Sequence, residues 1–376
     1  MKEILKLNEI SSKVNAILTQ DKYTVTSDAK EPCAIVLRSF SMHEYDMPKS
    51  VIAVARAGAG VNNIPLDKMS EQGVCVFNTP GANANAVKEL VLFALLVSSR
   101  KIYEGINWTQ NLEKNGEVNK QVEKGKKAFV GQEIFGKTLG IVGLGAIGKL
   151  VANAVIALGM KVIAYDPFVS STDLPIELTS DINVIYKNCD YITLHVPATP
   201  QTKNSVNKDT IALMKDGVRI INLARGELVN NEDIKKAIAD KKVAKYVTDL
   251  PCDEILGVDG IITIPHLGAS TEEAEDNCAV MAANQLKDYL ENGNIVNSVN
   301  FPKLQVERNG KCRVCIVSED IQNAVATATA TLKNISSINS ATRGNIVYII
   351  ADLSSDADEK AIEALKANAL RVRVIK

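Results

Sequence analysis

The sequence predicts an α/β protein with two doubly wound domains and a small C-terminal βαββαβ domain. Short apolar runs alternate with helical stretches from near the N-terminus to about residue 300, which is typical of βαβ units around a parallel sheet. A glycine-rich turn directly follows one of these runs. After residue 310 the pattern changes, because two strand candidates follow one another there without a helix between them.

The composition is that of an ordinary globular protein. The chain of 376 residues corresponds to two or three domains at roughly 150 residues each. Its 43 Lys and Arg nearly balance 44 Asp and Glu, giving a formal net charge of −1. We therefore expect no nucleic acid or other polyanion as a partner.

The apolar runs are too short for a membrane helix. The longest, residues 90–97, falls well below the roughly 18 residues that span a bilayer, so no membrane partner is expected. The N-terminus lacks the apolar core of a signal peptide, which favours a cytoplasmic location. Seven cysteines is an odd number, which predicts reduced thiols and no metal site.

Two series of βαβ units are separated by a polar stretch. In the first series, strand candidates at residues 34–37, 51–55 and 74–77 precede an apolar helix candidate at 86–99. Residues 106–127 carry no strand signal, which indicates a domain boundary. The second series has strand candidates at residues 138–142, 161–165, 191–194, 219–223, 246–249 and 261–264. Six strands with helices between them favour a doubly wound sheet, followed by a helix over 271–292.

The C-terminal segment predicts a small sandwich. Strands are expected at residues 312–317, near 338, at 346–352 and at 370–375, with helices at 321–333 and 357–368. Cys312 and Cys315 form a C-x-x-C pair in the first of these strands. Because positions i and i+3 of a strand point to opposite faces, the pair indicates two core residues rather than a redox motif.

The glycine-rich turn predicts a dinucleotide site. Gly143, Gly145 and Gly148 form G-x-G-x-x-G between a strand and a helix. The three glycines permit a tight turn, close approach to a pyrophosphate and close helix packing, while free N–H groups meet the phosphate charge. The next strand ends at Asp166, where an acid would accept hydrogen bonds from a ribose. No Arg or Lys follows at 167–172 to hold a 2′-phosphate, so NAD is favoured over NADP.

Three polar residues follow three strand candidates, and ligands of doubly wound sheets bind at the carboxyl ends of strands. His266 suits a base that takes the proton of a secondary alcohol. Glu254 would orient the imidazole, and Arg225 would grip a substrate carboxylate. Taken singly, they could also be a capping residue, a loop acid and a surface cation. His195 ends another strand and either holds its loop or lines the nicotinamide pocket, whereas His43 is expected at the surface.

These residues resemble the D-isomer-specific 2-hydroxyacid dehydrogenase family over roughly residues 34–302. The matching stretches are R-A-G-A-G-V at 56–61, N-T-P-G at 78–81, G-K-T-L-G-I-V-G-L-G at 136–145, N-L-A-R-G at 222–226 and P-H-L-G-A-S-T at 265–271. The resemblance implies that Arg225, Glu254 and His266 are catalytic. The loop from Asp249 to His266 is shorter than is usual in the family.

The resemblance also implies ligand contacts and domain limits. For the cofactor it implies Gly143, Gly145, Ala146, Ile147, Gly148, Asp166, Leu223, Asp249, His266, Gly268 and Ala269. For the substrate it implies Arg38, Arg56, Lys126 and Arg225, with the backbone N–H groups of Ala57 and Gly58. It implies a discontinuous substrate-binding domain at 1–98 and 276–302, an NAD-binding domain at 99–275 and a regulatory domain, similar to ACT domains, at 310–376.

The activity that the resemblance implies is NAD-dependent oxidation of 3-phospho-D-glycerate to 3-phosphohydroxypyruvate, the first step of phosphorylated L-serine biosynthesis. The alternatives are hydroxypyruvate or glyoxylate reduction, D-lactate dehydrogenation, or NAD sensing without turnover. The resemblance further implies a homodimer or homotetramer. A serine effector stays open, because residues 318–323 depart from the effector-binding turn of relatives.

Overall fold

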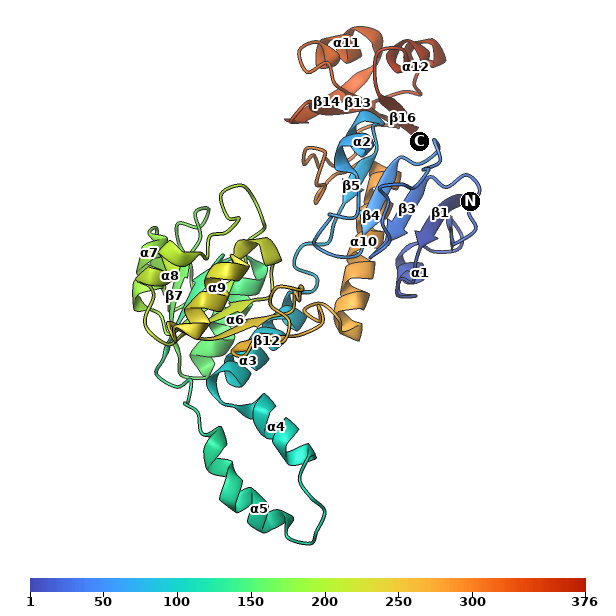
Figure 1. Cartoon of the computed structure of the whole chain (residues 1–376). Helices are drawn as coiled ribbons and strands as arrows, with labels where there is room; N and C mark the ends of the chain where they lie inside the picture. Colours follow the sequence, from blue (N-terminus) through green and yellow to red (C-terminus); the bar gives the residue numbers. More distant parts are fainter. The chain divides into compact units, whose positions relative to one another are not determined.

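The computed structural model describes all 376 residues, which divide into two compact units. Unit 1 comprises Met1–Asn83 and Glu272–Lys376, and unit 2 comprises Ala84–Thr271 (Figure 1). The divisions therefore lie at 83/84 and 271/272, whereas the sequence predicted 98/99 and 275/276. The first division precedes helix α3 (Ala84–Ser99) because its apolar face packs in the core of unit 2.

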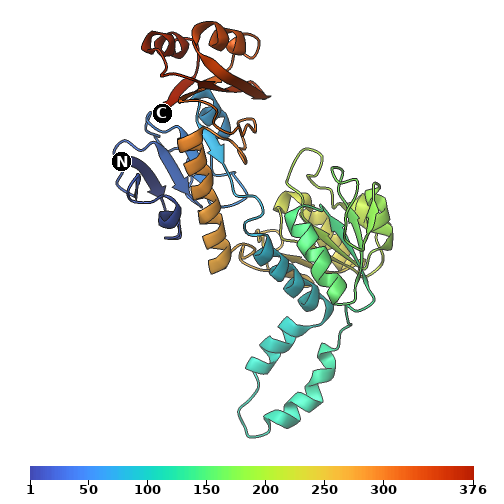
Figure 2. The same cartoon turned by 180° about the vertical axis from the view of Figure 1, so that it is seen from behind.

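Unit 1 contains a parallel five-stranded sheet in the order β2-β1-β3-β4-β5. Its elements are β1 (Lys2–Leu7), α1 (Val14–Ile17), β2 (Tyr23–Thr26), β3 (Ala34–Leu37), β4 (Ala53–Arg56), α2 (Leu66–Glu71) and β5 (Cys75–Phe77). The strands β3, β4 and β5 lie within one or two residues of the predicted ranges, whereas β1 and β2 were not predicted. Helix α10 (Glu272–Asn292) returns to this sheet (Figure 2). Its small buried residues Ala279, Ala282 and Ala283 pack against the sheet.

A second, antiparallel sheet completes unit 1. It has the order β14-β15-β13-β16. Its elements are β13 (Cys312–Ser318), α11 (Ala324–Thr331), β14 (Ile335–Arg343), β15 (Ile346–Leu353), α12 (Glu359–Lys366) and β16 (Arg371–Ile375), which confirms the predicted βαββαβ order. Cys312 packs in the core beneath α11 and α12, whereas Cys315 packs in the core shared with the first sheet. The two cysteines thus lie on opposite faces, as predicted.

Unit 2 is a parallel seven-stranded sheet in the order β12-β11-β10-β9-β6-β7-β8. Its strands are β6 (Thr138–Val142), β7 (Lys161–Tyr165), β8 (Glu177–Thr179), β9 (Tyr191–Leu194), β10 (Val218–Asn222), β11 (Val243–Thr248) and β12 (Ile261–Thr263). Its other helices are α6 (Ala146–Ala157), α7 (Ile182–Asn188), α8 (Lys208–Leu213), η2 (Gly226–Leu228) and α9 (Asn231–Ala239). Apolar cores cover both faces, which confirms the doubly wound prediction.

The polar stretch predicted as a boundary forms a helical arm of unit 2. The arm consists of α4 (Ile102–Gln110), α5 (Val118–Gly125) and η1 (Lys126–Phe129), which project from the sheet (Figure 1). None of the three helices contains a buried residue. Trp108 and Phe129 hold them together, with ring centroids 5.2 Å apart.

None of the helices combines the length and the apolar composition that crossing a membrane requires.

Candidate active site

The glycine-rich turn connects β6 to α6 in a conformation that depends on its glycines. Gly143 adopts φ +98°, and a side chain on it would lie 2.5 Å from the carbonyl oxygen of His195. A side chain on Gly148 would collide with the carbonyl of Gly143. Around Gly145, by contrast, nothing lies within 4 Å of the position of a Cβ atom. The turn is therefore tight inside and open at Gly145, next to the first residues of α6, Ala146 and Ile147, as a pyrophosphate site requires.

Asp166 follows the end of β7 and is joined to the same turn. Its Oδ2 accepts a hydrogen bond from the Leu144 N–H at 2.8 Å, and its Oδ1 accepts one from the Phe168 N–H at 2.9 Å. These bonds fix the carboxylate beside the turn. Each carboxylate oxygen has a second lone pair, so Asp166 can still accept hydrogen bonds from ribose hydroxyls.

The three predicted catalytic residues lie at one edge of the unit 2 sheet. Arg225 follows β10, Glu254 follows β11 and His266 follows β12, and these three strands are neighbours. All three side chains are exposed. Glu254, His266 and Asp249 line one cavity of about 520 Å³. Arg225 is not part of its lining, although the next residue, Gly226, is.

The loop that carries His266 is anchored to Asp249. The His266 N–H donates to the carbonyl oxygen of Asp249 at 2.9 Å, and the Gly268 N–H donates to Asp249 Oδ2 at 3.0 Å. His266 itself adopts φ +26°, a conformation that non-glycine residues rarely adopt and that is often found at functional sites.

Asp249 is the most deeply buried carboxylate of this edge. It is 2% exposed, and its Oδ1 has no hydrogen-bond partner. Burial raises the pKa of the Asp249 carboxyl, while the Gly268 N–H and the charges of His266 and Arg225 oppose that rise. A buried acceptor without a donor is costly. A ligand that donates a hydrogen bond here, as the nicotinamide carboxamide of NAD can, would satisfy it.

The neighbour that affects Glu254 is not the predicted one. The Cys252 thiol beside it lowers the pKa of the Glu254 carboxyl. Cys252 also accepts a bond from Asn231 Nδ2 at 3.3 Å. The structure has no hydrogen bond between Glu254 and His266, so the two share a cavity without forming the predicted pair. The sequence did not indicate the role of Cys252, because a single cysteine in a loop carries no signal.

The other two histidines differ from His266. His195 follows β9, and its Nε2 lies 3.0 Å from the hydroxyl oxygen of Thr193. Burial lowers the pKa of His195 to about 4, so the ring is neutral near pH 7. Its carbonyl lies against the glycine turn, which favours a role in holding that loop. His43 is exposed, as predicted.

The predicted cofactor contacts Leu223, Gly268 and Ala269 also belong to this edge. Leu223 directly follows β10 and is 8% exposed, within the core beneath α6. Gly268 is buried against Asp249.

Unit 1 holds four predicted substrate residues around the ends of β3 and β4. Arg56 Nε donates to Asn63 Oδ1 at 3.0 Å, and Asn63 Nδ2 donates to the carbonyl oxygen of Arg38 at 3.1 Å. Asn63 therefore bridges the Arg56 guanidinium and the Arg38 backbone carbonyl. The Ala57 N–H donates to the Leu37 carbonyl at 2.7 Å and the Gly58 N–H to the Arg56 carbonyl at 2.9 Å, so both predicted carboxylate donors already have partners.

Lys126 lies elsewhere. It is on η1 of the arm, exposed and paired with Glu123, and it does not line the cavity of Glu254 and His266.

Comparison with known proteins identifies a family to which the sequence is similar. Residues 92–268 match the model of the D-isomer specific 2-hydroxyacid dehydrogenase, NAD binding domain. The D-3-phosphoglycerate dehydrogenase of Methanocaldococcus jannaschii is 34% identical over 86% of this chain and 62% of its own length. The hydroxypyruvate reductase of Thermotoga maritima is 42% identical over 60% of this chain and 74% of its own length.

A solved structure has the same fold. The NAD⁺-bound 3-phosphoglycerate dehydrogenase of Entamoeba histolytica matches with a TM-score of 0.65 and 26% identity, over 81% of this chain and 99% of that one. The chain spans 62%, 47% and 52% of the curated phosphoglycerate relatives from M. jannaschii, Synechocystis and Archaeoglobus fulgidus.

Proposed function

Because the chain belongs to the D-isomer specific 2-hydroxyacid dehydrogenase family, we propose that it oxidises 3-phospho-D-glycerate to 3-phosphohydroxypyruvate with NAD, the first step of phosphorylated L-serine biosynthesis. The observation that carries the reaction class is the shared cavity of Glu254, His266 and Asp249, which lies at the carboxyl ends of the same sheet whose strand β6 leads into the dinucleotide turn. Several relatives named D-3-phosphoglycerate dehydrogenase support the substrate.

The proposed mechanism assigns one task to each side chain. NAD, when bound, accepts the hydride. His266 takes the proton of the substrate hydroxyl through its imidazole and returns it in the reverse direction. Glu254 stabilises the imidazolium through its negative charge, and Arg225 holds the substrate carboxylate through charge-assisted hydrogen bonds. Asp249 keeps the His266 loop in place and accepts a hydrogen bond from the cofactor.

We assign the phosphate to the cationic cluster of unit 1. Arg38 directly follows β3 and Arg56 ends the neighbouring strand β4, so the two guanidinium groups start from adjacent strand ends. Arginine suits phosphate because its planar fork donates two parallel hydrogen bonds. Lys126 is the third predicted cation. Because Lys126 lies on the arm, its role in phosphate binding should be tested in the assembled oligomer.

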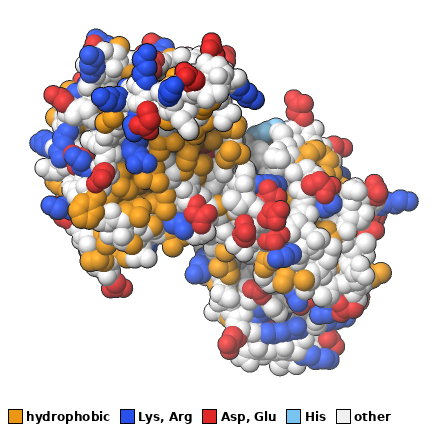
Figure 3. All heavy atoms as spheres, turned by 90° about the horizontal axis from the view of Figure 1, so that it is seen from below, with side chains coloured by type: hydrophobic (Ala, Val, Ile, Leu, Met, Phe, Trp, Pro, Cys, Tyr) orange, Lys and Arg blue, Asp and Glu red, His pale blue; other side chains and the backbone are white.

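The surface of unit 2 supports assembly into a homodimer or homotetramer. Figure 3 shows hydrophobic side chains gathered on the body at its left. Unit 2 exposes seven large apolar residues in or beside α3 and the arm, namely Phe93, Leu96, Tyr103, Ile106, Val118, Val130 and Phe135. Exposed apolar patches of this kind commonly mark protein interfaces. A second copy of the chain would cover them.

Light scattering during size-exclusion chromatography tests this assembly. We expect the wild type to elute as a dimer or tetramer and the Phe93→Glu, Leu96→Glu double variant to elute as a monomer. A monomeric wild type at micromolar concentration would contradict the proposal.

We further propose that the βαββαβ segment is an ACT-like domain. Its strand order and antiparallel pairing support this. Serine added to the activity assay tests whether it serves as an effector domain.

Hydroxypyruvate reduction is the second candidate function, favoured by the 42% identity to the T. maritima enzyme. Measuring NADH oxidation with 3-phosphohydroxypyruvate, hydroxypyruvate, glyoxylate, pyruvate and 2-oxoglutarate separates the candidates. We expect the phosphorylated compound to be reduced with the highest kcat/KM. Faster reduction of an unphosphorylated acid would favour the second function, and NADH binding without any turnover would favour a sensor.

A further inference from the structure

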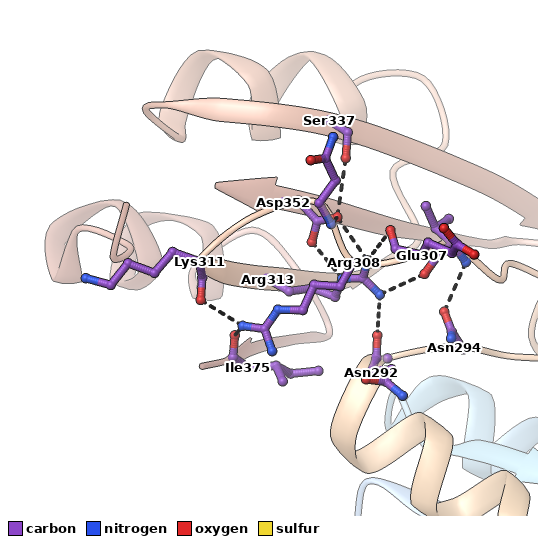
Figure 4. Close-up of polar contacts among 12 residues, drawn as sticks. Asn292, Asn294, Glu307, Arg308, Lys311, Arg313, Ser337, Asp352 and Ile375 are labelled. Carbon is purple, nitrogen blue, oxygen red and sulfur yellow. Dashed lines mark hydrogen bonds and ion pairs between the residues drawn. The ribbon is translucent and has the colours of Figure 1, made fainter. Parts of the chain in front are cut away.

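The C-terminal sheet contains an ion pair that is shielded from solvent. Arg313 on β13 and Asp352 on β15 are both 0% exposed and face each other across paired strands. The distances are 2.7 Å from Arg313 Nε to Asp352 Oδ1 and 2.9 Å from Arg313 Nη2 to Asp352 Oδ2 (Figure 4). Asp352 Oδ2 also accepts bonds from the Asn309 N–H and the Ser337 hydroxyl. Such a bidentate pair fixes orientation as well as charge.

The remaining donors of Arg313 reach outside its own sheet. Nη1 donates to the carbonyl oxygens of Asn292 at 2.7 Å and Val306 at 3.1 Å, and Nη2 donates to that of Glu307 at 3.0 Å (Figure 4). A guanidinium has five N–H donors, so every one of them is used. Asn292 is the last residue of α10, and Val306 and Glu307 belong to the segment that connects α10 to β13.

Two more side chains of the C-terminal sheet bind the same end of α10. Arg373 Nη2 donates to the carbonyl oxygens of Tyr289 at 2.9 Å and Leu290 at 3.3 Å. The Tyr348 hydroxyl donates to that of Gly293 at 2.6 Å. The last carbonyls of a helix have no partner within it, and cations are favourable there. The C-terminal sheet therefore supplies the cap of α10.

The opposite end and the middle of α10 support the proposed substrate residues. Glu275 near its N-terminus pairs with Arg38. Gln285 Nε2 donates to the Asn78 carbonyl at 2.9 Å, and Asn78 Nδ2 donates to the Ala59 carbonyl at 2.7 Å. One helix thus holds both the arginine assigned to the phosphate and the loop that carries Ala57 and Gly58.

We propose that the C-terminal sheet is a fixed clamp on α10 and that Arg313 is a positioning residue for substrate binding. The proposal rests on the proposed function, in which Arg38 and Arg56 bind the phosphate of the substrate; the 57–59 loop directly follows Arg56. The second face of the sheet supports it, because Cys315, Val317 and Tyr348 lie in one core with Phe77 and Tyr289. Because the clamp acts within unit 1, we expect it to affect the binding of the 2-oxo acid and not the binding of NADH.

The test measures KM for 3-phosphohydroxypyruvate and Kd for NADH in three full-length variants. Arg313→Lys keeps the charge but has fewer donors, Tyr348→Phe removes one hydrogen bond, and Asp356→Asn breaks the exposed Lys311–Asp356 pair of the same domain as a matched control. Since small displacements of binding groups have large effects, we expect KM to rise roughly fivefold or more in Arg313→Lys. We expect a smaller rise in Tyr348→Phe, none in Asp356→Asn, and an unchanged Kd for NADH in all three.

Hydrogen exchange of the α10 C-terminal turn and of the 57–59 loop gives a readout independent of turnover. Faster exchange at both places in Tyr348→Phe supports the clamp. Faster exchange at the helix end, with unchanged exchange in the loop and an unchanged KM, would overturn the proposal. A loss of NADH affinity that accompanies the rise in KM would also overturn it. If Arg313→Lys does not fold, KM and hydrogen exchange of Tyr348→Phe alone test the proposal. A wild type that binds NADH but reduces no 2-oxo acid contradicts the proposed function alone, and exchange at the loop then tests the clamp.

Discussion

The parallel sheets of the two units both end in proposed ligand-binding residues, but they position them differently. In unit 2 the glycine turn follows β6 directly, and only Ile264 and Pro265 separate His266 from β12. In unit 1 Arg38 and Arg56 also lie at strand ends, but their side chains are held by Glu275 from a distant helix and by Asn63. The position of a residue at a strand end is therefore visible in the sequence, whereas the partner that orients its side chain is not.

The largest expected effect is at the edge of unit 2. His266→Asn removes the proposed base and should lower kcat by roughly 10²–10⁴-fold. The Kd for NADH should stay nearly constant, because the dinucleotide turn lies elsewhere on the sheet. Steady-state kinetics with NADH fluorescence titration measures both. An unchanged kcat would place the base on another residue.

The next largest effect is expected from replacing a cation of unit 1. Arg56→Gln should raise KM for 3-phosphohydroxypyruvate by roughly 10–100-fold, since hydrogen bonds between charged groups contribute about 1.5–3 kcal/mol. KM for hydroxypyruvate should barely change, because it has no phosphate. Lys49→Gln, an exposed cation of the same unit, is the control. Equal losses with both substrates would remove Arg56 from the phosphate site.

Two glycines of the dinucleotide turn are expected to affect different quantities, one the affinity for NADH and the other the stability of unit 2. Gly145→Ala places a methyl group in open space and should raise the Kd for NADH about tenfold, equivalent to roughly 1.4 kcal/mol, without lowering Tm. Gly148→Ala meets the Gly143 carbonyl and should destabilise the fold by about 1–3 kcal/mol. Calorimetry and NADH titration separate the two. A lower Tm in Gly145→Ala together with a weaker NADH affinity only in Gly148→Ala would mean that the pyrophosphate does not bind beside Gly145.

The smallest effect concerns His195. Its pKa falls from the ordinary 6.5 to about 4 on folding, so the unfolded chain binds a proton that the folded one does not. The stability that His195 contributes is therefore complete above pH 6.5 and is lost as the pH falls towards 4. The slope is of the order of 1 kcal/mol per pH unit. Urea unfolding at pH 7, 6 and 5 should show a shallower loss in His195→Gln, and equal slopes would contradict the neutral buried ring.

Most of the strands could be predicted because buried parallel strands are short, continuous apolar runs. β6, β7 and β9 match the predicted ranges. β1 was missed because lysine and glutamate interrupt its apolar residues, and β8 because three residues carry too little pattern. The arm was assigned as a boundary, since its helices bury nothing.

The site could be predicted in part for the same reason. Sequence placed Glu254 and His266 at neighbouring strand ends, and the structure puts them in one cavity. It did not indicate that Cys252 affects the pKa of the Glu254 carboxyl, or that Arg313 caps α10. Both depend on contacts between residues whose sequence neighbours give no sign of them.

The preference for a phosphorylated substrate is tested most directly by the ratio of kcat/KM for 3-phosphohydroxypyruvate to that for hydroxypyruvate. The ratio is measured with NADH in the wild type and in Arg56→Gln. We predict a ratio well above one in the wild type that collapses in the variant. A wild-type ratio at or below one would contradict the phosphorylated substrate and assign the chain to a sister activity of the family.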